Sequence, residues 1–229
     1  MTLNIPDHRT ILFQILKDIY SDTTLAPYLG FKGGTAALLF YGLDRFSVDL
    51  DFDLLAEKEE DRVFTRMGQI IEKYGVIKES HQKRFNLFYL LSYRKGAQHI
   101  KIEINRRQFG SNYEIKTLLG VSMLVMVQPD MFAHKLVAMS ERLSKTSRDL
   151  YDVWYFLSKN FPLNEDIVKA RTNLSLKQLV TNCIDQIEKI PDRNILTGLG
   201  ELLNPNQKDW ARAKLKGETI SLLSIRFLT

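Results

Sequence analysis

The chain has 229 residues, enough for one large domain or for a medium-sized domain with an appendage. Hydrophobic residues make up 45% of the chain, which supplies a core and excludes general disorder. Its 32 Lys and Arg against 27 Asp and Glu give a net charge of +5, which suits an anionic partner without requiring one.

Cysteine content and hydropathy set the expected compartment. Cys183 is the only cysteine, which excludes an internal disulfide and a cysteine-rich metal site, and its apolar neighbours predict a buried helical thiol. The first residues lack the basic segment and apolar run of a signal peptide. No stretch reaches the roughly 18 to 20 apolar residues of a membrane span. We therefore expect a cytoplasmic protein without a membrane partner.

The first half of the chain mixes helical and strand patterns. Apolar residues at helical spacing predict a helix over 11–19, and a second helix follows the glycines over 35–41. Strict alternation predicts a strand over 48–54, and 57–74 is expected to be helical. Further strands are predicted from β-branched and aromatic runs over 75–79, 85–93, 99–105 and 121–127.

Pro129 marks a change of pattern. Beyond it the apolar residues recur only at helical spacing. Helices are predicted over 130–143, 147–159 and 174–189, with two shorter segments before residue 229. The expected fold is therefore α/β (α+β): a mixed sheet with flanking helices over 1–128, followed by an all-helical half over 129–229.

The strand predicted over 48–54 carries the first chemical signal. Residues two apart on a strand share a face, so Asp49, Asp51 and Asp53 lie together and repel each other. A hard divalent cation would offset this repulsion. Carboxylates at this spacing can bridge two metals about 4 Å apart for in-line phosphoryl transfer. The alternative is a solvated acidic strand edge.

Two glycines precede this strand. Gly33 and Gly34 come just before an apolar helix, where their backbone can approach a ligand and present N–H groups to a phosphate. Thr35 can add a hydroxyl donor or cap the helix. The pattern favours a phosphate site next to the aspartates.

A third carboxylate lies on the strand predicted over 99–105. Lys101, Glu103 and Asn105 share its polar face. If this strand lies beside the aspartate strand, Glu103 is placed to bind a metal or to take a proton from an attacking hydroxyl. The alternative is an exposed Glu103 paired with Lys101.

The segment GGTAALLFYGLDRFSVDLDF (33–52) resembles the first motif of the DNA-polymerase-beta-like nucleotidyltransferases, a Gly-Gly/Ser pair followed by Asp-x-Asp. More closely, it resembles the AbiEii/AbiGii (MenT-like) toxin branch, in which Arg-x-Ser-x-Asp-x-Asp-Phe is typical. The residues that match this pattern are Arg45, Ser47, Asp49, Asp51 and Phe52.

A second signature lies beyond Pro129. HKLVA (134–138) and RDLYD (148–152) resemble the family's Lys-Leu-x-Ala and Arg-Asp-x-x-Asp motifs. The resemblance makes Lys135 a phosphate-binding lysine and places Asp149 and Asp152 in the active centre. An ammonium group there would neutralise charge that develops on the leaving pyrophosphate. The alternative is a solvated helix with an i,i+4 pair between the first and last residues of RDLYD.

The resemblance implies a toxin of a toxin–antitoxin pair that transfers a nucleoside monophosphate from an NTP to a hydroxyl, by analogy at the 3′ end of tRNA, with an antitoxin as partner. The half over 1–128 would be the catalytic domain, and 129–229 would complete the active site. Residues 160–229 match no known pattern. The resemblance and the alternation of the two polar strands together give the expected catalytic residues: Asp49, Asp51, Glu103, Lys135, Asp149 and Asp152. Expected NTP contacts are Gly33, Gly34, Thr35, Arg45, Ser47 and Lys135, and Mg²⁺ (or Mn²⁺) would be held by Asp49, Asp51 and Glu103.

Three basic pairs are expected at strand ends, where they could rim one groove beside Asp49: Lys83–Arg84, Arg94–Lys95 and Arg106–Arg107. Lys and Arg contacts to phosphate dominate RNA affinity, so these are the candidate RNA-facing residues. Two other functions stay open. One is transfer to a small molecule or a protein hydroxyl. The other is a module that binds NTP or an antitoxin without turnover, although the intact Asp49, Asp51 and Lys135 argue against it.

Overall fold

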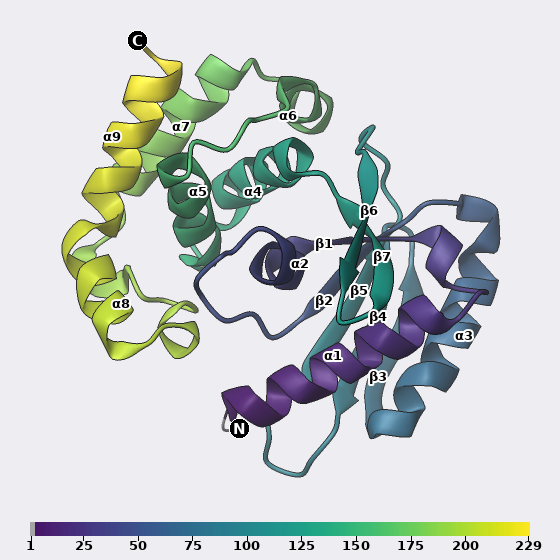
Figure 1. Cartoon of the computed structure of the whole chain (residues 1–229). Coiled ribbons are helices and arrows are strands. Elements are labelled where there is room, and N and C mark those ends of the chain that lie inside the picture. The colour runs from purple at the N-terminus through teal and green to yellow at the C-terminus, as the bar shows by residue number, and fades with distance from the viewer. Residues whose placement is uncertain (1–2) are drawn as a thin grey trace. The chain divides into compact units, whose positions relative to one another are not determined.

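The computed structural model describes residues 3–229 and divides into two compact units (Figure 1). The sheet unit contains the chain up to Gln108 and the segment Asn112–Val127. The helical unit contains Phe109–Ser111 and Gln128–Thr229. Within residues 3–229, none of the helices has the length and apolar character needed to cross a membrane.

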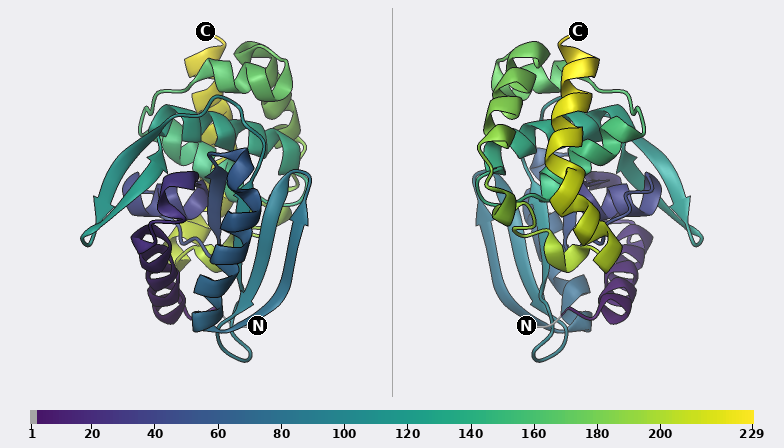
Figure 2. Two further views of the ribbon diagram at one scale, coloured as in Figure 1. Left: turned by 90° about the vertical axis from the view of Figure 1, so that its right-hand side faces the viewer. Right: turned by 90° about the vertical axis from the view of Figure 1, so that its left-hand side faces the viewer.

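Within the described residues, the sheet unit is built on seven strands in the order β3-β4-β5-β2-β1-β7-β6. The pairs β2/β5 and β1/β7 are parallel and the other four are antiparallel. The edge strands β3 and β6 lie on opposite sides of the left view in Figure 2. The strands are β1 (Leu29–Lys32), β2 (Leu50–Leu54), β3 (Val76–Lys83), β4 (Asn86–Ser92), β5 (Ile100–Asn105), β6 (Tyr113–Leu118) and β7 (Val121–Met126).

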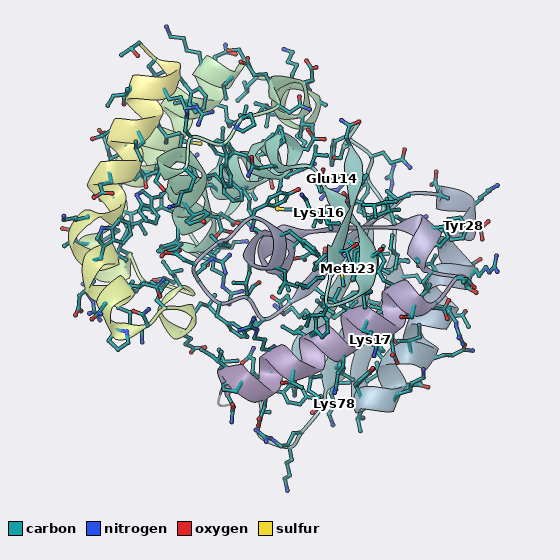
Figure 3. All side chains as sticks on the ribbon, viewed as in Figure 1. Lys17, Tyr28, Lys78, Glu114, Lys116 and Met123 are labelled. Atoms are coloured by element: carbon teal, nitrogen blue, oxygen red, sulfur yellow. The ribbon has the colours of Figure 1, made fainter. Side chains whose placement is uncertain are left out.

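Helices α1 (Ile5–Ser21), α2 (Gly33–Phe40) and α3 (Glu60–Ile71) complete the sheet unit, with 3₁₀ turns at Ala26–Tyr28, Glu57–Glu59 and Glu72–Tyr74. The side chain of Asn4 caps α1 by accepting the backbone N–H of Asp7. The apolar face of α1 is buried and Lys17 is exposed (Figure 3). Helix α1 contacts α3 and β7, while α3 contacts β3 and β4.

The helical unit contains α4 (Gln128–Arg142), α5 (Arg148–Ser158), α6 (Glu165–Thr172), α7 (Leu176–Glu188), α8 (Pro205–Trp210) and α9 (Lys216–Phe227). Short helical turns lie at Asp192–Asn194 and Gly200–Leu202, and a π turn (Ala211–Leu215) joins α8 to α9. Helix α4 packs on α5, α6 and α7, and α9 packs on α5 and α7. The ring centroids of Phe132 and Phe156 lie 5.5 Å apart in the resulting core. Capping boxes begin α7 and α8.

The predicted fold class is confirmed, and three elements were missed. Strand β1 is short and contains Gly30, and strands of this kind resemble loops in sequence. Strand β6 exposes Ile115, so its apolar residues do not mark a buried face. Helix α6 is only 8 residues long, which is too short for a clear period. The strand predicted over 48–54 begins at Leu50, so Asp49 precedes it.

Candidate active site

The register of three neighbouring strands gathers polar side chains on one face of the sheet. Asp51 in β2 lies opposite Lys32 in β1 and beside Glu103 in the parallel strand β5. Two residues further along, Asp53 pairs with Asn105. The strand that carries Glu103 therefore lies beside the aspartates, which is the condition for a role of Glu103 at this site.

Asp53 is neutralised by the protein itself. Its Oδ1 accepts hydrogen bonds from Lys32 Nζ and Asn105 Nδ2, both at 2.6 Å, and its Oδ2 accepts the hydroxyl of Tyr113 at 2.6 Å. The side chain is buried. The expectation that a cation must offset the charge of all three aspartates is therefore wrong for Asp53, which joins β1, β5 and β6 to β2.

Asp49 lies just before β2, where a side-chain hydroxyl and a backbone N–H contact it. The Thr35 hydroxyl donates to the Asp49 carbonyl, and the Lys101 N–H lies 3.4 Å from Asp49 Oδ1. The helix-cap alternative for Thr35 is wrong, because Lys32 occupies the N-cap position of α2. Thr35 instead fixes the backbone that carries Asp49.

Gly33 and Gly34 allow two close approaches at the start of α2. Gly33 has φ +80°, and a Cβ at this position would overlap the Asp51 carboxylate. A Cβ on Gly34 would lie 2.7 Å from Ser47 Oγ and 3.1 Å from Arg45 Nη2. The two glycines thus bring the N-terminus of α2 against the Asp-x-Asp strand and against Arg45 and Ser47, which are both buried.

Glu103 is half-buried, and its Oε1 accepts a hydrogen bond of 3.1 Å from Asn86 Nδ2. The alternative of an exposed Glu103 is therefore wrong. Among residues 3–229, no three His, Cys, Asp or Glu side chains form a ready-made metal site. Mg²⁺ at nucleotide sites is commonly held by one or two carboxylates together with substrate phosphates. Asp49 and Asp51 fit a site of that kind.

In the helical unit, two buried aspartates hold Lys135. Its Nζ lies 2.7 Å from Asp152 Oδ2 and 3.4 Å from Asp149 Oδ1. Arg142 binds Asp149 Oδ2 through two nitrogens at 2.7 and 3.1 Å. The side chains of Asp149 and Asp152 are 1% and 0% exposed, which contradicts the alternative of a solvated helix.

The family assignment follows from a match over most of the chain. A model of the family described as nucleotidyl transferase AbiEii toxin, type IV toxin–antitoxin system, matches residues 14–218. The chain belongs to the AbiEii family. It is thus a member of a family of nucleotidyltransferase toxins, and both motifs described above lie within the matched region.

Two solved Helicobacter pylori structures share the fold of this AbiEii protein. One, assigned as a nucleotidyltransferase, has a TM-score of 0.62 and 21% identity, covering 98% of this chain and 95% of the other. The second, JHP933, has a TM-score of 0.59 and 21% identity, covering 98% and 93%. No curated protein matches this chain.

The basic pairs do not rim one groove. Lys83 closes β3, and Arg106 Nη1 donates to its carbonyl, so these two pairs lie at the same end of the sheet. The pair Arg94–Lys95 follows β4 at the other end. Arg106 forms an ion pair with Glu60, and this partner makes it a poor RNA contact. At the end that carries Arg106, Phe85 is 51% exposed.

Sequence reasoning missed His8, which supports the backbone next to Asp49. Its Nε2 donates to the Val48 carbonyl at 2.9 Å, so its Nδ1 accepts the Tyr93 hydroxyl at 3.0 Å. Burial lowers the pKa of His8, while the Val48 carbonyl and the Asp49 charge act in the opposite direction. A single histidine on an amphipathic helix gives no signal for this role.

The prediction for Cys183 is confirmed: it is buried, and burial raises the pKa of its thiol to about 12.

Proposed function

We propose that this AbiEii protein transfers a nucleoside monophosphate from an NTP to a hydroxyl acceptor in a metal-dependent reaction. The contact between Gly33, the first residue of α2, and the carboxylate of Asp51 carries the proposal. It combines a helix N-terminus, which favours phosphate, with an acidic strand, which favours a divalent cation. Arg45 and Ser47 pack against Gly34 beside them.

Asp49 and Asp51 would hold Mg²⁺ or Mn²⁺, and Glu103 would be a third ligand or the base. When bound, the cation would screen phosphate charge and activate the attacking hydroxyl. Asn86 orients the Glu103 carboxylate by donating to one of its oxygens. The other oxygen would then accept the proton of the acceptor hydroxyl.

Lys135 would bind the phosphates of the same NTP, and the helical half over 129–229 would thereby complete the active site. Asp149 and Asp152 already hold its ammonium group. Lys135 would therefore lose less conformational entropy when it binds the NTP than a mobile lysine would. The two aspartates would act by positioning Lys135. A point charge at this position neutralises the leaving pyrophosphate.

The acceptor would be the 3′ end of tRNA, with the protein acting as the toxin beside a cognate antitoxin. The surface around Phe85 supports an RNA acceptor, because the guanidinium groups of Arg84 and Arg107 lie 5.1 and 5.7 Å from its ring centroid. Aromatic rings flanked by arginines stack single-stranded bases and bind their phosphates. Transfer to a small molecule or a protein hydroxyl would not need this surface.

The proposal is tested by incubating the protein with each labelled NTP, Mg²⁺ and total RNA. We expect label on tRNA with the wild type and with Asp61→Asn, an exposed aspartate on α3 that serves as the matched control. Asp51→Asn should give no label. Transfer by Asp51→Asn at the wild-type rate would refute the metal assignment, and label on another molecule would replace tRNA as the acceptor.

The RNA surface is tested by salt and by charge reversal. Labelling of tRNA should fall steeply between about 50 and 200 mM salt, because phosphate contacts release counterions. Arg107→Glu should reduce labelling and leave NTP affinity unchanged. Lys95→Glu, at the other end of the sheet, is the control and should match the wild type. Equal losses in both variants would mean that total charge, and not this surface, attracts the RNA.

A further inference from the structure

The helical unit contains a cavity of about 630 Å³ that none of the proposed catalytic residues lines. It lies where the C-terminal end of α4 and the loop before α5 meet the segment after α7, with Ser140, Leu143, Gln186 and Pro191 among its lining residues. This volume is within the range that holds a small molecule of nucleotide size.

The charge of the cavity is positive. Among residues 3–229, Lys145 and Lys189 line it and no Asp or Glu does. Within the part of the chain that the structure describes, neither lysine has a carboxylate within ion-pair distance. The nearby Lys216, in contrast, lies 3.7 Å from Asp192. The cavity therefore favours an anion.

The side chain of a buried serine, Ser147, also lines the cavity. Ser147 is 2% exposed and occupies the N-cap position of α5, yet its side chain makes no cap hydrogen bond. Its backbone N–H donates to the Thr197 carbonyl at 2.9 Å. An N-cap serine ordinarily bonds its own helix, and Ser147 does not. This hydroxyl is available to a ligand at the N-terminus of α5, an 11-residue helix.

We propose that this cavity binds a small phosphate-bearing molecule. The phosphate would accept hydrogen bonds from Ser147 and from Lys145 and Lys189, and Leu143 and Ile190 would contact the apolar part of the ligand. None of the cavity-lining residues belongs to the proposed NTP site, so the two sites are independent.

The test is calorimetric titration of the full-length protein with AMP, adenosine and inorganic phosphate in EDTA, which suppresses metal-dependent NTP binding. AMP should bind. Adenosine should bind at least about tenfold more weakly, because it lacks the charged phosphate acceptor. If inorganic phosphate binds as tightly as AMP, the natural ligand is free phosphate. Tighter binding of AMP identifies a phosphorylated organic molecule.

Variants locate the binding site. Lys145→Ala, Lys189→Ala and Ser147→Ala should each weaken AMP binding, the lysine variants by about tenfold. Lys177→Ala, an exposed lysine on α7, is the matched control and should leave affinity unchanged. Asp51→Asn should also bind AMP normally. Absence of binding at millimolar AMP, or binding that Asp51→Asn removes and the lysine variants do not, would overturn the proposal.

Discussion

The two units use pairs of aspartates in opposite ways. In the helical unit, Asp149 and Asp152 are buried and make ion pairs with the basic side chains of α4. In the sheet unit, only Asp53 is buried within a network of protein donors, while Asp49 and Asp51 are half-buried. A buried carboxylate with fixed partners positions a cation of the protein, whereas a half-buried one can still bind a cation from solution. The spacing of the aspartates does not distinguish these uses, but their burial does.

The largest expected effect is on transfer in the sheet unit. Asp51→Asn should lower the rate of nucleotide transfer by about 10³-fold or more, because the charge that holds the metal is lost. Its free energy of unfolding in metal-free buffer should equal or exceed that of the wild type, since like-charge repulsion is relieved. Single-turnover labelling and urea unfolding measure the two. A large loss of stability would mean that Asp51, like Asp53, is a structural residue.

In the helical unit, unlike at Asp51, substitution of Lys135 should lower the stability of the protein. Lys135→Ala leaves two buried carboxylates with one fewer cation, and we expect a loss of about 3–5 kcal/mol in the free energy of unfolding. Adding Asp152→Asn should restore part of this loss, because it removes a buried negative charge that no longer faces the lysine. A loss below about 1 kcal/mol, or a double variant less stable than Lys135→Ala, would contradict a positioning role for the aspartates.

Asp53 and Asp51 lie on the same strand, so variants of the two compare a structural aspartate with a metal-binding one. Asp53→Asn weakens three hydrogen bonds, and we expect a cost of about 1–3 kcal/mol in the free energy of unfolding. Tyr113→Phe should cost less, because it removes only one donor. Urea unfolding compares both variants with Asp51→Asn. Equal stability of Asp51→Asn and Asp53→Asn would break the distinction between them.

The smallest expected effect is the pH dependence of the stability of the sheet unit. Because burial lowers the pKa of His8, the unfolded chain binds its proton first as the pH falls below the ordinary value of 6.5. The stabilisation is therefore complete above pH 6.5 and is lost as the pH falls toward the folded pKa. Hydrogen exchange should show the α1 and β2 peptides losing protection between pH 7 and 5 more than those of α5. His8→Gln should reduce this difference, and an unchanged difference would exclude His8 as its cause.

The sequence by itself determined the family, the fold class and the main helices. The motif residues Gly33, Gly34, Asp49 and Asp51 lie within 19 positions of each other, so local spacing identifies them. The apolar periods of α4 and α5 likewise express contacts within one or two turns. These features depend on neighbours along the chain, and pattern reasoning finds such neighbours.

The tertiary structure alone decided which charges are neutralised. The partners of Asp53 lie 21, 52 and 60 residues away, on β1, on β5 and on β6. The strand order brings them together, and no local period records that order. The separation of Arg94 from Arg106 and the burial of Asp152 arise in the same way. The electrostatic environment of a side chain is set by the elements packed around it, because desolvation and pairing act through space and not along the chain.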